Sequence, residues 1–327
     1  MPSTALLLAL LTPSMAAAAS FCDTTAGWNQ TWVDEFTGDD IDSSSWSVSS
    51  GACGSYGRSA NCTLEDTYIE DGSLVLRSRQ PSPGVYTTGA VTTAGKVAWK
   101  DSPKFRMCIS AILPSGRSAG GSSQGIWPAH WLMPDDSSCD PDEGEVDILE
   151  MINGDSTAYA TYHWIDNWPA ETCKGTEGNN HYHHINGAVT MPDDWDSAYH
   201  EYAVERSSEY LAFVVDGKTV LNKTVDSSDV TAPLLWQMPF HLILNTAIGG
   251  GWPGEPDDTT GFPAYHKIDF VKVSTSSQDG ENPLADPDQC GNFCDPQFGP
   301  GCGPGACANC REAGLDAQGA IAYACQN

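Results

Sequence analysis

Short apolar runs alternate with turn residues along most of the chain. From about residue 30 to residue 275 the runs are rich in β-branched and aromatic residues and are interrupted by Gly, Pro, Asn and Asp, the pattern of strands joined by turns. The predicted strands are 105–113, 125–133, 145–152, 158–164, 200–205, 240–247 and 268–273. Many short strands in succession predict an all-β protein built as an antiparallel sandwich.

Two of the predicted turns carry an Asp-Gly pair between strand-like runs. Asp71-Gly72 lies within residues 67–76, and Asp216-Gly217 lies within residues 210–220. Asp-Gly is a preferred pair for the type I′ turn, in which both central residues take a positive φ. The sequence therefore predicts a tight β-hairpin at each position.

The first 19 residues have the features of a secretory signal peptide. An apolar run from Ala5 to Leu11 precedes a series of small residues suited to signal peptidase, although no Lys or Arg stands before the run. The run is shorter than the roughly 18 residues that cross a bilayer. We therefore expect a secreted, extracellular, soluble protein. Three sequons are then candidates for surface glycosylation, at Asn29, Asn61 and Asn222.

Twelve cysteines fit an oxidising compartment. Six are spread over residues 22–173 and six fall within residues 290–325, and each group is expected to form disulfides. Zinc is the alternative for the second group because Cys307 and Cys310 form a C-x-x-C pair, but a clean second pair is missing. The sequence leaves the connectivity open.

Composition divides the chain into four segments. The signal peptide (1–19) is followed by a β-rich domain (20–274), a linker rich in Ser, Asp and Pro (275–287) and a Cys-rich module (288–327). The module is too short to fold on its apolar residues alone. It either clamps the C-terminus onto the main domain or binds a polymer.

Charge narrows the range of partners. The chain has 15 Lys and Arg against 43 Asp and Glu, a formal net charge of −28. Nucleic acid and anionic membranes would be repelled, so we expect neither as a partner. Because 40% of the residues are hydrophobic, the chain can bury a core and is not a disordered acidic segment. We expect a monomer.

Three carboxylates lie in one predicted strand. In a regular strand Glu145 and Asp147 share a face and Glu150 points away, but a β-bulge at Ile148-Leu149 would bring Glu150 to the same face. Carboxylates crowded on one face repel one another, a cost that glycoside hydrolysis would explain, because a retaining enzyme needs two carboxyls about 5–5.5 Å apart. The alternatives are an acidic solvated face or a calcium site that includes Asp140 and Asp142.

The motifs around this strand resemble glycoside hydrolase family 16, in its laminarinase-like branch with a bulged catalytic strand. The family motif E-x-D-x-x-E matches Glu145, Asp147 and Glu150. Further matches lie in the family's order within residues 32–273: D-E-F-x-G from Asp34, G-x-W-P-A-x-W from Gly125, T-Y-H-W from Thr161, V-D-G from Val215 and L-N-x-A-x-G-G-x-W-P-G from Leu244. The chain departs from the family at Arg206, where many members have Trp, and within 105–110, which lacks a Glu and an Arg of a G-R-x-E-x-R motif.

The resemblance implies a concave β-jelly-roll sandwich with a short disulfide-rich C-terminal extension. It also implies a secreted, endo-acting, retaining β-glucanase that hydrolyses internal β-1,3 bonds, with mixed β-1,3/1,4 glucans as a further substrate. In that scheme Glu145 is the nucleophile, Glu150 is the acid and base, and Asp147 hydrogen-bonds the nucleophile and tunes both pKa values. The partner is a β-glucan polysaccharide and no cofactor is needed, with a structural calcium left open.

Aromatic and polar residues of the matched motifs are the predicted sugar contacts. Indoles stack on the apolar faces of pyranose rings, and sugar hydroxyls need Asn, His or carboxylate partners. The predicted substrate-binding residues are Trp127, Trp131, His163, Asn245 and Trp252. The histidine-rich run 181–184 is interpreted as a polar loop, since no acidic third ligand lies nearby, and no metal site is predicted.

Other functions on the same fold stay open. A β-glucan-binding protein without activity would lack one or both glutamates, whereas this chain retains both. A transglycosylase would use the same residues, because water and a sugar hydroxyl compete for one intermediate. Action on algal galactans is a further alternative, and the charge of −28 argues against sulfated ones.

Overall fold

The computed structural model describes residues 20–23, 27–99, 104–135, 144–165, 182–207, 210–224, 239–276, 310–315 and 321–325. Nearly every regular element in these ranges is a β-strand, which confirms the all-β prediction. The helical elements in the same ranges are single 3-10 turns: η1 (Phe21–Asp23), η2 (Gly54–Tyr56), η3 (Leu64–Asp66) and η4 (Arg117–Ala119). No helix within them has the length and apolar character that a membrane crossing needs.

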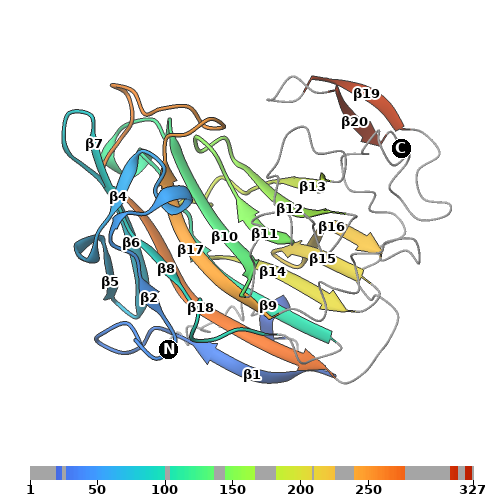
Figure 1. Ribbon diagram of the computed structural model, residues 1–327. Helices are drawn as coiled ribbons and strands as arrows, with labels where there is room; N and C mark the ends of the chain where they lie inside the picture. Colours follow the sequence, from blue (N-terminus) through green and yellow to red (C-terminus); the bar gives the residue numbers. More distant parts are fainter. Residues whose placement is uncertain are drawn as a thin grey trace, which may run out of the picture.

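The larger of two stacked sheets has eleven strands (Figure 1). They are β1 (Asn29–Asp34), β3 (Gly51–Ala52), β4 (Ala60–Cys62), β5 (Thr67–Glu70), β6 (Ser73–Ser82), β7 (Val85–Thr88), β9 (Lys104–Ile112), β14 (His200–Ser207), β15 (Tyr210–Val215), β16 (Lys218–Thr224) and β18 (Ala264–Ser276). Their order is β16-β15-β14-β9-β18-β6-β7-β4-β3, with β1 paired to β18 and β5 paired to β6. The pairs are antiparallel except β4 with β7.

The smaller sheet has seven strands, all in antiparallel pairs. They are β2 (Ser47–Val48), β8 (Ala90–Thr92), β10 (Ile126–Pro134), β11 (Glu145–Glu150), β12 (Thr157–Ile165), β13 (Tyr182–Thr190) and β17 (Phe240–Ile248). Their order is β13-β12-β11-β10-β17-β8-β2. Near the C-terminus, β19 (Cys310–Leu315) and β20 (Ile321–Cys325) form a separate antiparallel pair.

The hydrophobic core lies between the two sheets. Both sheets supply large buried side chains, among them Leu74, Met107, Ile109, Tyr202, Phe213, Val146, Leu149, Tyr162, Leu242 and Leu244. In the smaller sheet these residues alternate with others that point away from the larger sheet, as the period of two requires. We call that second face the open face.

Both predicted hairpins are present. Asp71 and Gly72 have φ values of 51° and 74° and join β5 to β6, and Asp216 and Gly217 have φ values of 48° and 74° and join β15 to β16. Two successive positive φ values are the requirement of the type I′ turn. The local turn chemistry therefore fixes these strand connections.

Two disulfides are formed within the described residues. Cys22–Cys108 ties the N-terminal segment to β9, and Cys53–Cys62 closes a short loop before η3. The expectation of disulfides in the first half is confirmed for these four cysteines. Cys139, Cys173 and the side chains of the Cys-rich module lie outside the described residues, and so does the C-x-x-C pair as a zinc site.

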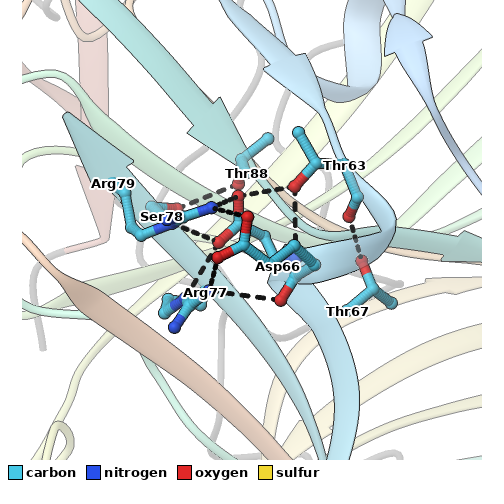
Figure 2. Close-up of polar contacts among 8 residues, drawn as sticks. Thr63, Asp66, Thr67, Arg77, Ser78, Arg79 and Thr88 are labelled. Carbon is cyan, nitrogen blue, oxygen red and sulfur yellow. Dashed lines mark hydrogen bonds and ion pairs between the residues drawn. The ribbon is translucent and has the colours of Figure 1, made fainter. Parts of the chain in front are cut away.

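A buried charge network stabilises the turn that precedes β5 (Figure 2). Asp66 is fully buried and accepts hydrogen bonds from Arg77 Nε at 2.8 Å and from Arg79 Nε at 2.5 Å. Thr63, the N-cap of η3, donates to Asp66 Oδ2 at 2.6 Å and accepts from the Asp66 backbone N–H at 3.2 Å. Both carboxylate oxygens of Asp66 therefore accept hydrogen bonds from the protein in place of water.

One expectation about the chain's organisation changes. β18 continues to Ser276, which pairs with Lys104, so the predicted linker 275–287 begins two residues too early. The rest of that linker lies outside the described residues. The departures from the family motifs fall on β9 and β14 of the larger sheet, where Arg106 forms a buried ion pair with Glu205. They therefore do not lie on the open face.

Candidate active site

The three carboxylates of β11 share the open face because the strand contains a β-bulge. Against β12, Asp147 pairs with Thr161 and Glu150 pairs with Tyr159, so β11 uses one residue more than β12 over the same stretch. The extra residue returns Glu150 to the face of Asp147, while Ile148-Leu149 pack into the core. The predicted bulge is present.

Asp147 is the central and most enclosed of the three carboxylates, with 3% of its surface exposed. It forms a hydrogen bond with Glu145 on the same strand and lies 3.0 Å from His163 Nε2 through its Oδ2 atom. Glu145 and His163 are direct neighbours across the β11–β12 ladder. The sequence motif for His163 thus marks a residue that contacts the carboxylate cluster.

Burial raises the pKa of both Asp147 and Glu150. For Asp147 the nearby charge of Glu150 raises the pKa further, and the hydrogen bond with Glu145 opposes it. For Glu150 the charges of His163 and Arg58 act in the opposite direction to burial. Neighbouring carboxyls that repel one another do not all ionise at the same pH, so the cluster can hold a proton while one member is charged. That is the condition for a paired acid and nucleophile.

Aromatic side chains border the cluster at Glu150. Trp127 Nε1 donates a hydrogen bond to Glu150 Oε1 at 3.0 Å. The Trp127 ring meets Trp252 edge to face at a centroid distance of 5.4 Å, and Tyr159 lies 5.3 Å from Trp252. These three rings are partly exposed, so they offer apolar surface next to the carboxylates. Contact of Trp127 and Trp252 with a sugar stays a prediction.

Trp131 and Asn245 lie on the same face but are buried. Trp131 Nε1 donates to Asn245 Oδ1 at 2.8 Å, and Asn245 Nδ2 donates to the backbone oxygen of Tyr56 at 3.0 Å. The Tyr56 ring packs edge-on against Trp131 at 5.8 Å. Their polar groups are therefore already paired within the protein. This geometry favours support of the site over the direct sugar contact that the motifs predict.

The segment between Cys53 and Cys62 contributes two residues that no motif or pattern in the sequence marked as part of the site. Its Tyr56 covers Trp131, and its Arg58 carries the guanidinium carbon 5.2 Å from the centroid of Trp127. No periodic pattern marks an irregular loop, and the close Cys spacing was the one available signal. Tyr159 was also missed, although it shares the parity of His163 on β12 and could have been found by alternation.

The histidine-rich run is not a loop where the structure describes it. Tyr182–Thr190 forms β13, and His184 pairs with His163 with their rings 5.8 Å apart. The polar-loop interpretation is therefore wrong for this part of the run. β13 is the edge strand of the smaller sheet, so its exposed side carries polar residues that weaken the strand pattern. His181 lies outside the described residues.

Glu145, Asp147 and His163 each offer one ligand-type atom within 4.8 Å of the others. Calcium prefers six to eight oxygen ligands. This set of three does not suit calcium, because one member is an imidazole and the three side chains contact one another. Asp140 and Asp142, the alternative calcium ligands, lie outside the described residues. The mutual contacts instead suit proton transfer.

Known proteins of similar sequence and structure share the strands that build this site. The family model described as Glycosyl hydrolases family 16 matches residues 114–272, which include the four strands β10, β11, β12 and β17. The β-glucanase of Rhodothermus marinus is 29% identical over 297 residues, 84% of this chain and 94% of that protein. The laminarinase catalytic domain of Thermotoga maritima is 30% identical with a TM-score of 0.61, covering 77% of this chain and 99% of that one. The endo-β-1,3-glucanase of Pyrococcus furiosus is 28% identical with a TM-score of 0.62, covering 77% and 96%.

Proposed function

This chain belongs to glycosyl hydrolase family 16 and is a glycoside hydrolase. We propose that it is an endo-acting, retaining β-1,3-glucanase that also accepts mixed β-1,3/1,4 glucans. The observation that carries the proposal is the bulged strand that gathers Glu145, Asp147 and Glu150 on one face beside Trp127. The relatives named as a laminarinase and an endo-β-1,3-glucanase support the substrate.

The proposed reaction is a double displacement at the anomeric carbon. Glu145 attacks that carbon and forms a glycosyl-enzyme bond, while Glu150 gives its proton to the departing glycosidic oxygen. A water molecule then takes the place of the departed sugar and forms a bond to the anomeric carbon, while Glu150 takes a proton from that water and the bond between the carbon and Glu145 breaks. The configuration of the sugar is retained because two inversions occur.

Asp147 supports both steps without bonding to the sugar. Its hydrogen bond with Glu145 and its contact with His163 hold the nucleophile in place. Its raised pKa, which burial and the Glu150 charge cause, suits a group that shares protons with the two glutamates. Trp127, which donates to Glu150, orients the acid.

We also propose that the protein is secreted and glycosylated. The leader-like residues 1–19 and the disulfides Cys22–Cys108 and Cys53–Cys62 support an oxidising route. Asn29 and Asn61 are exposed, as glycan acceptors must be, and Asn222 is partly buried. Mass spectrometry of the protein from a eukaryotic secretory host, before and after deglycosylation, tests this part.

In the first experiment the protein is incubated with laminarin, barley mixed-linkage glucan, agarose or carboxymethylcellulose. The size and the anomeric configuration of the products are followed by NMR. We expect short β-anomer oligosaccharides from laminarin, with a lower rate on barley glucan. Initial α-anomer products would contradict retention, and products from agarose alone would contradict the glucan substrate. Binding of laminarin without cleavage would favour a β-glucan-binding protein.

The matched variants are Glu145→Gln and Glu150→Gln, with Glu70→Gln as the control. Glu70 is an exposed carboxylate of β5, outside the cluster. Loss of proton donation costs about 10²–10⁴-fold in rate, and loss of the nucleophile costs at least as much. Normal turnover by either site variant, with the fold intact by circular dichroism, would contradict the assignment.

A further inference from the structure

The loop between Cys53 and Cys62 is fastened to the open face beside the carboxylates. Its disulfide joins the two ends, and η2 lies between them. The backbone N–H of Ile248 donates to Gly57 at 3.2 Å, and the N–H of Ser59 donates to Ile248 at 2.9 Å. With the bond from Asn245 to Tyr56, these contacts attach the loop to β17 on either side of Arg58. The loop is therefore a fixed part of the site.

Arg58 is presented toward the site by this backbone. Its φ of 53° is unusual for a residue with a side chain, and its N–H donates to the Gly54 oxygen at 2.7 Å. The residue is exposed, and its guanidinium lies over the Trp127 ring at 5.2 Å. A cation over an indole is attracted by the ring's negative face. An unusual backbone conformation that places a charge at a catalytic edge is typical of a functional constraint.

Trp127 connects Arg58 to the acid. One side of the indole faces the guanidinium, and its Nε1 donates to Glu150 Oε1 at 3.0 Å. The positive charge of Arg58 also lowers the pKa of Glu150 against the larger effect of burial. Among the described residues, the titratable and charged groups next to Glu150 are Asp147 on β11, Tyr159 and His163 on β12, and Arg58 on the loop. Glu145 is hydrogen-bonded to Asp147, and Glu255 Oε1 accepts a hydrogen bond from Ser59 of the same loop at 3.0 Å. Arg58 is the member of this set with a permanent positive charge.

We propose that Arg58 is a positioning residue for proton transfer by Glu150: it holds the Trp127 indole against the acid and places a fixed positive charge beside it. This inference rests on the proposed role of Glu150. When Glu150 gives its proton to the glycosidic oxygen, it becomes a carboxylate, and a nearby guanidinium stabilises that charge as it forms. Arg58 therefore assists the step in which the leaving group needs a proton.

The molecule provides a matched control for the packing of an arginine on an indole. Arg117 lies over Trp195 at 5.1 Å and is about half exposed, with Asp196 at 3.6 Å. It is not among the groups around Glu150. Arg117→Gln removes the same kind of contact without removing a charge from the site.

The experiment compares Arg58→Gln, Arg58→Lys and Arg117→Gln on two substrates. Laminarin has a sugar leaving group that needs a proton, whereas a nitrophenyl β-laminaribioside releases a nitrophenolate anion, which leaves without one. For Arg58→Gln we expect kcat/KM on laminarin to fall about tenfold and to change little on the aryl glycoside. We expect Arg58→Lys to retain most of the activity and Arg117→Gln to match the wild type.

The pH profile gives a readout that a purely structural role would not move. Loss of the positive charge raises the pKa of Glu150, so the alkaline limb of kcat/KM should move up by about half a pH unit in Arg58→Gln and stay in place in Arg58→Lys. An equal fall on both substrates with an unmoved limb would overturn the inference, as would full activity of Arg58→Gln. A wild type that cleaves neither substrate would instead overturn the proposed function.

Discussion

Two buried aspartates differ in what surrounds them. Asp66 is 0% exposed beside β6, and Asp147 is 3% exposed on the open face. Burial raises the pKa of Asp66, but hydrogen bonds from Arg79, Thr63 and Arg77 outweigh it, and the pKa is lowered overall. Burial raises the pKa of Asp147 well above the ordinary value, the charge of Glu150 adds to this rise, and the hydrogen bond with Glu145 opposes it only in part.

This difference separates a carboxylate that stabilises the fold from one that we propose to take part in the reaction. At Asp66 the cost of removing a charge from water is offset by two guanidinium groups and a hydroxyl (Figure 2). At Asp147 the cost is offset only in part, because the charge of Glu150 adds to it and the hydrogen bond with Glu145 does not outweigh it. The other polar contact of Asp147 is His163 Nε2 at 3.0 Å. Shifted pKa values caused by burial and like charges gather at functional sites.

Among the variants that test this comparison of the two aspartates, the largest expected effect is the loss of activity in Asp147→Asn. The amide keeps the shape of the side chain but cannot ionise or share a proton with Glu145. We expect kcat/KM on laminarin to fall about 10²-fold. The free energy of unfolding at neutral pH should stay the same or rise, because a buried ionisable group is removed from repulsive surroundings.

The controls for Asp147→Asn are urea unfolding at pH 7 and the product anomer. A variant that unfolds more easily by several kcal/mol, or one that keeps full activity, would show that Asp147 is a structural carboxylate after all. In either outcome the distinction between the two aspartates would fail.

The second effect is expected in stability alone. Asp66→Asn removes the buried carboxylate that Arg77 and Arg79 share and leaves them only the exposed carboxylate of Glu65. Hydrogen bonds to charged groups are each worth about 1.5–3 kcal/mol. Since both arginines are partly exposed and water can solvate them, we expect a loss of about 2–4 kcal/mol in the free energy of unfolding. Activity on laminarin at 25 °C should stay within about twofold of the wild type.

The contribution of the Asp66 carboxylate to the free energy of unfolding should depend on pH. The pKa of Asp66 is below its ordinary value of 3.8 in the folded protein, so its stabilisation is complete above that value. As the pH falls through the ordinary value toward the folded one, protonation removes the stabilisation. The stability difference between wild type and Asp66→Asn should therefore shrink below about pH 4. A difference that is constant from pH 7 to pH 3 would contradict the assigned cause.

The features that depend on local periodicity or turn chemistry could be predicted from the sequence. The positions of residues that depend on tertiary contacts between distant segments could not. The bulge at Ile148-Leu149 follows from strand parity, and the two Asp-Gly hairpins follow from turn chemistry. Arg58 could not be placed, because its position depends on where an irregular loop fastens to β17. Arg77 and Arg79 share a face by alternation, but their contact with Asp66 depends on how the 3-10 turn of Asp66 packs against β6, which the sequence does not show.

The smallest expected effect concerns the hydroxyl in the Asp66 network. Thr63→Val keeps the shape but removes the donor to Asp66 Oδ2 and the acceptor of the Asp66 N–H, so we expect a loss of about 1–2 kcal/mol in unfolding free energy. Thr63→Ser keeps both bonds and should stay within about 0.5 kcal/mol of the wild type. Thr63 directly follows Cys62, the end of the loop that carries Arg58. An unchanged kcat/KM in Thr63→Val would show that the Asp66 network acts on stability and not on the proposed catalytic site. A tenfold fall would show that the loop couples the network to that site.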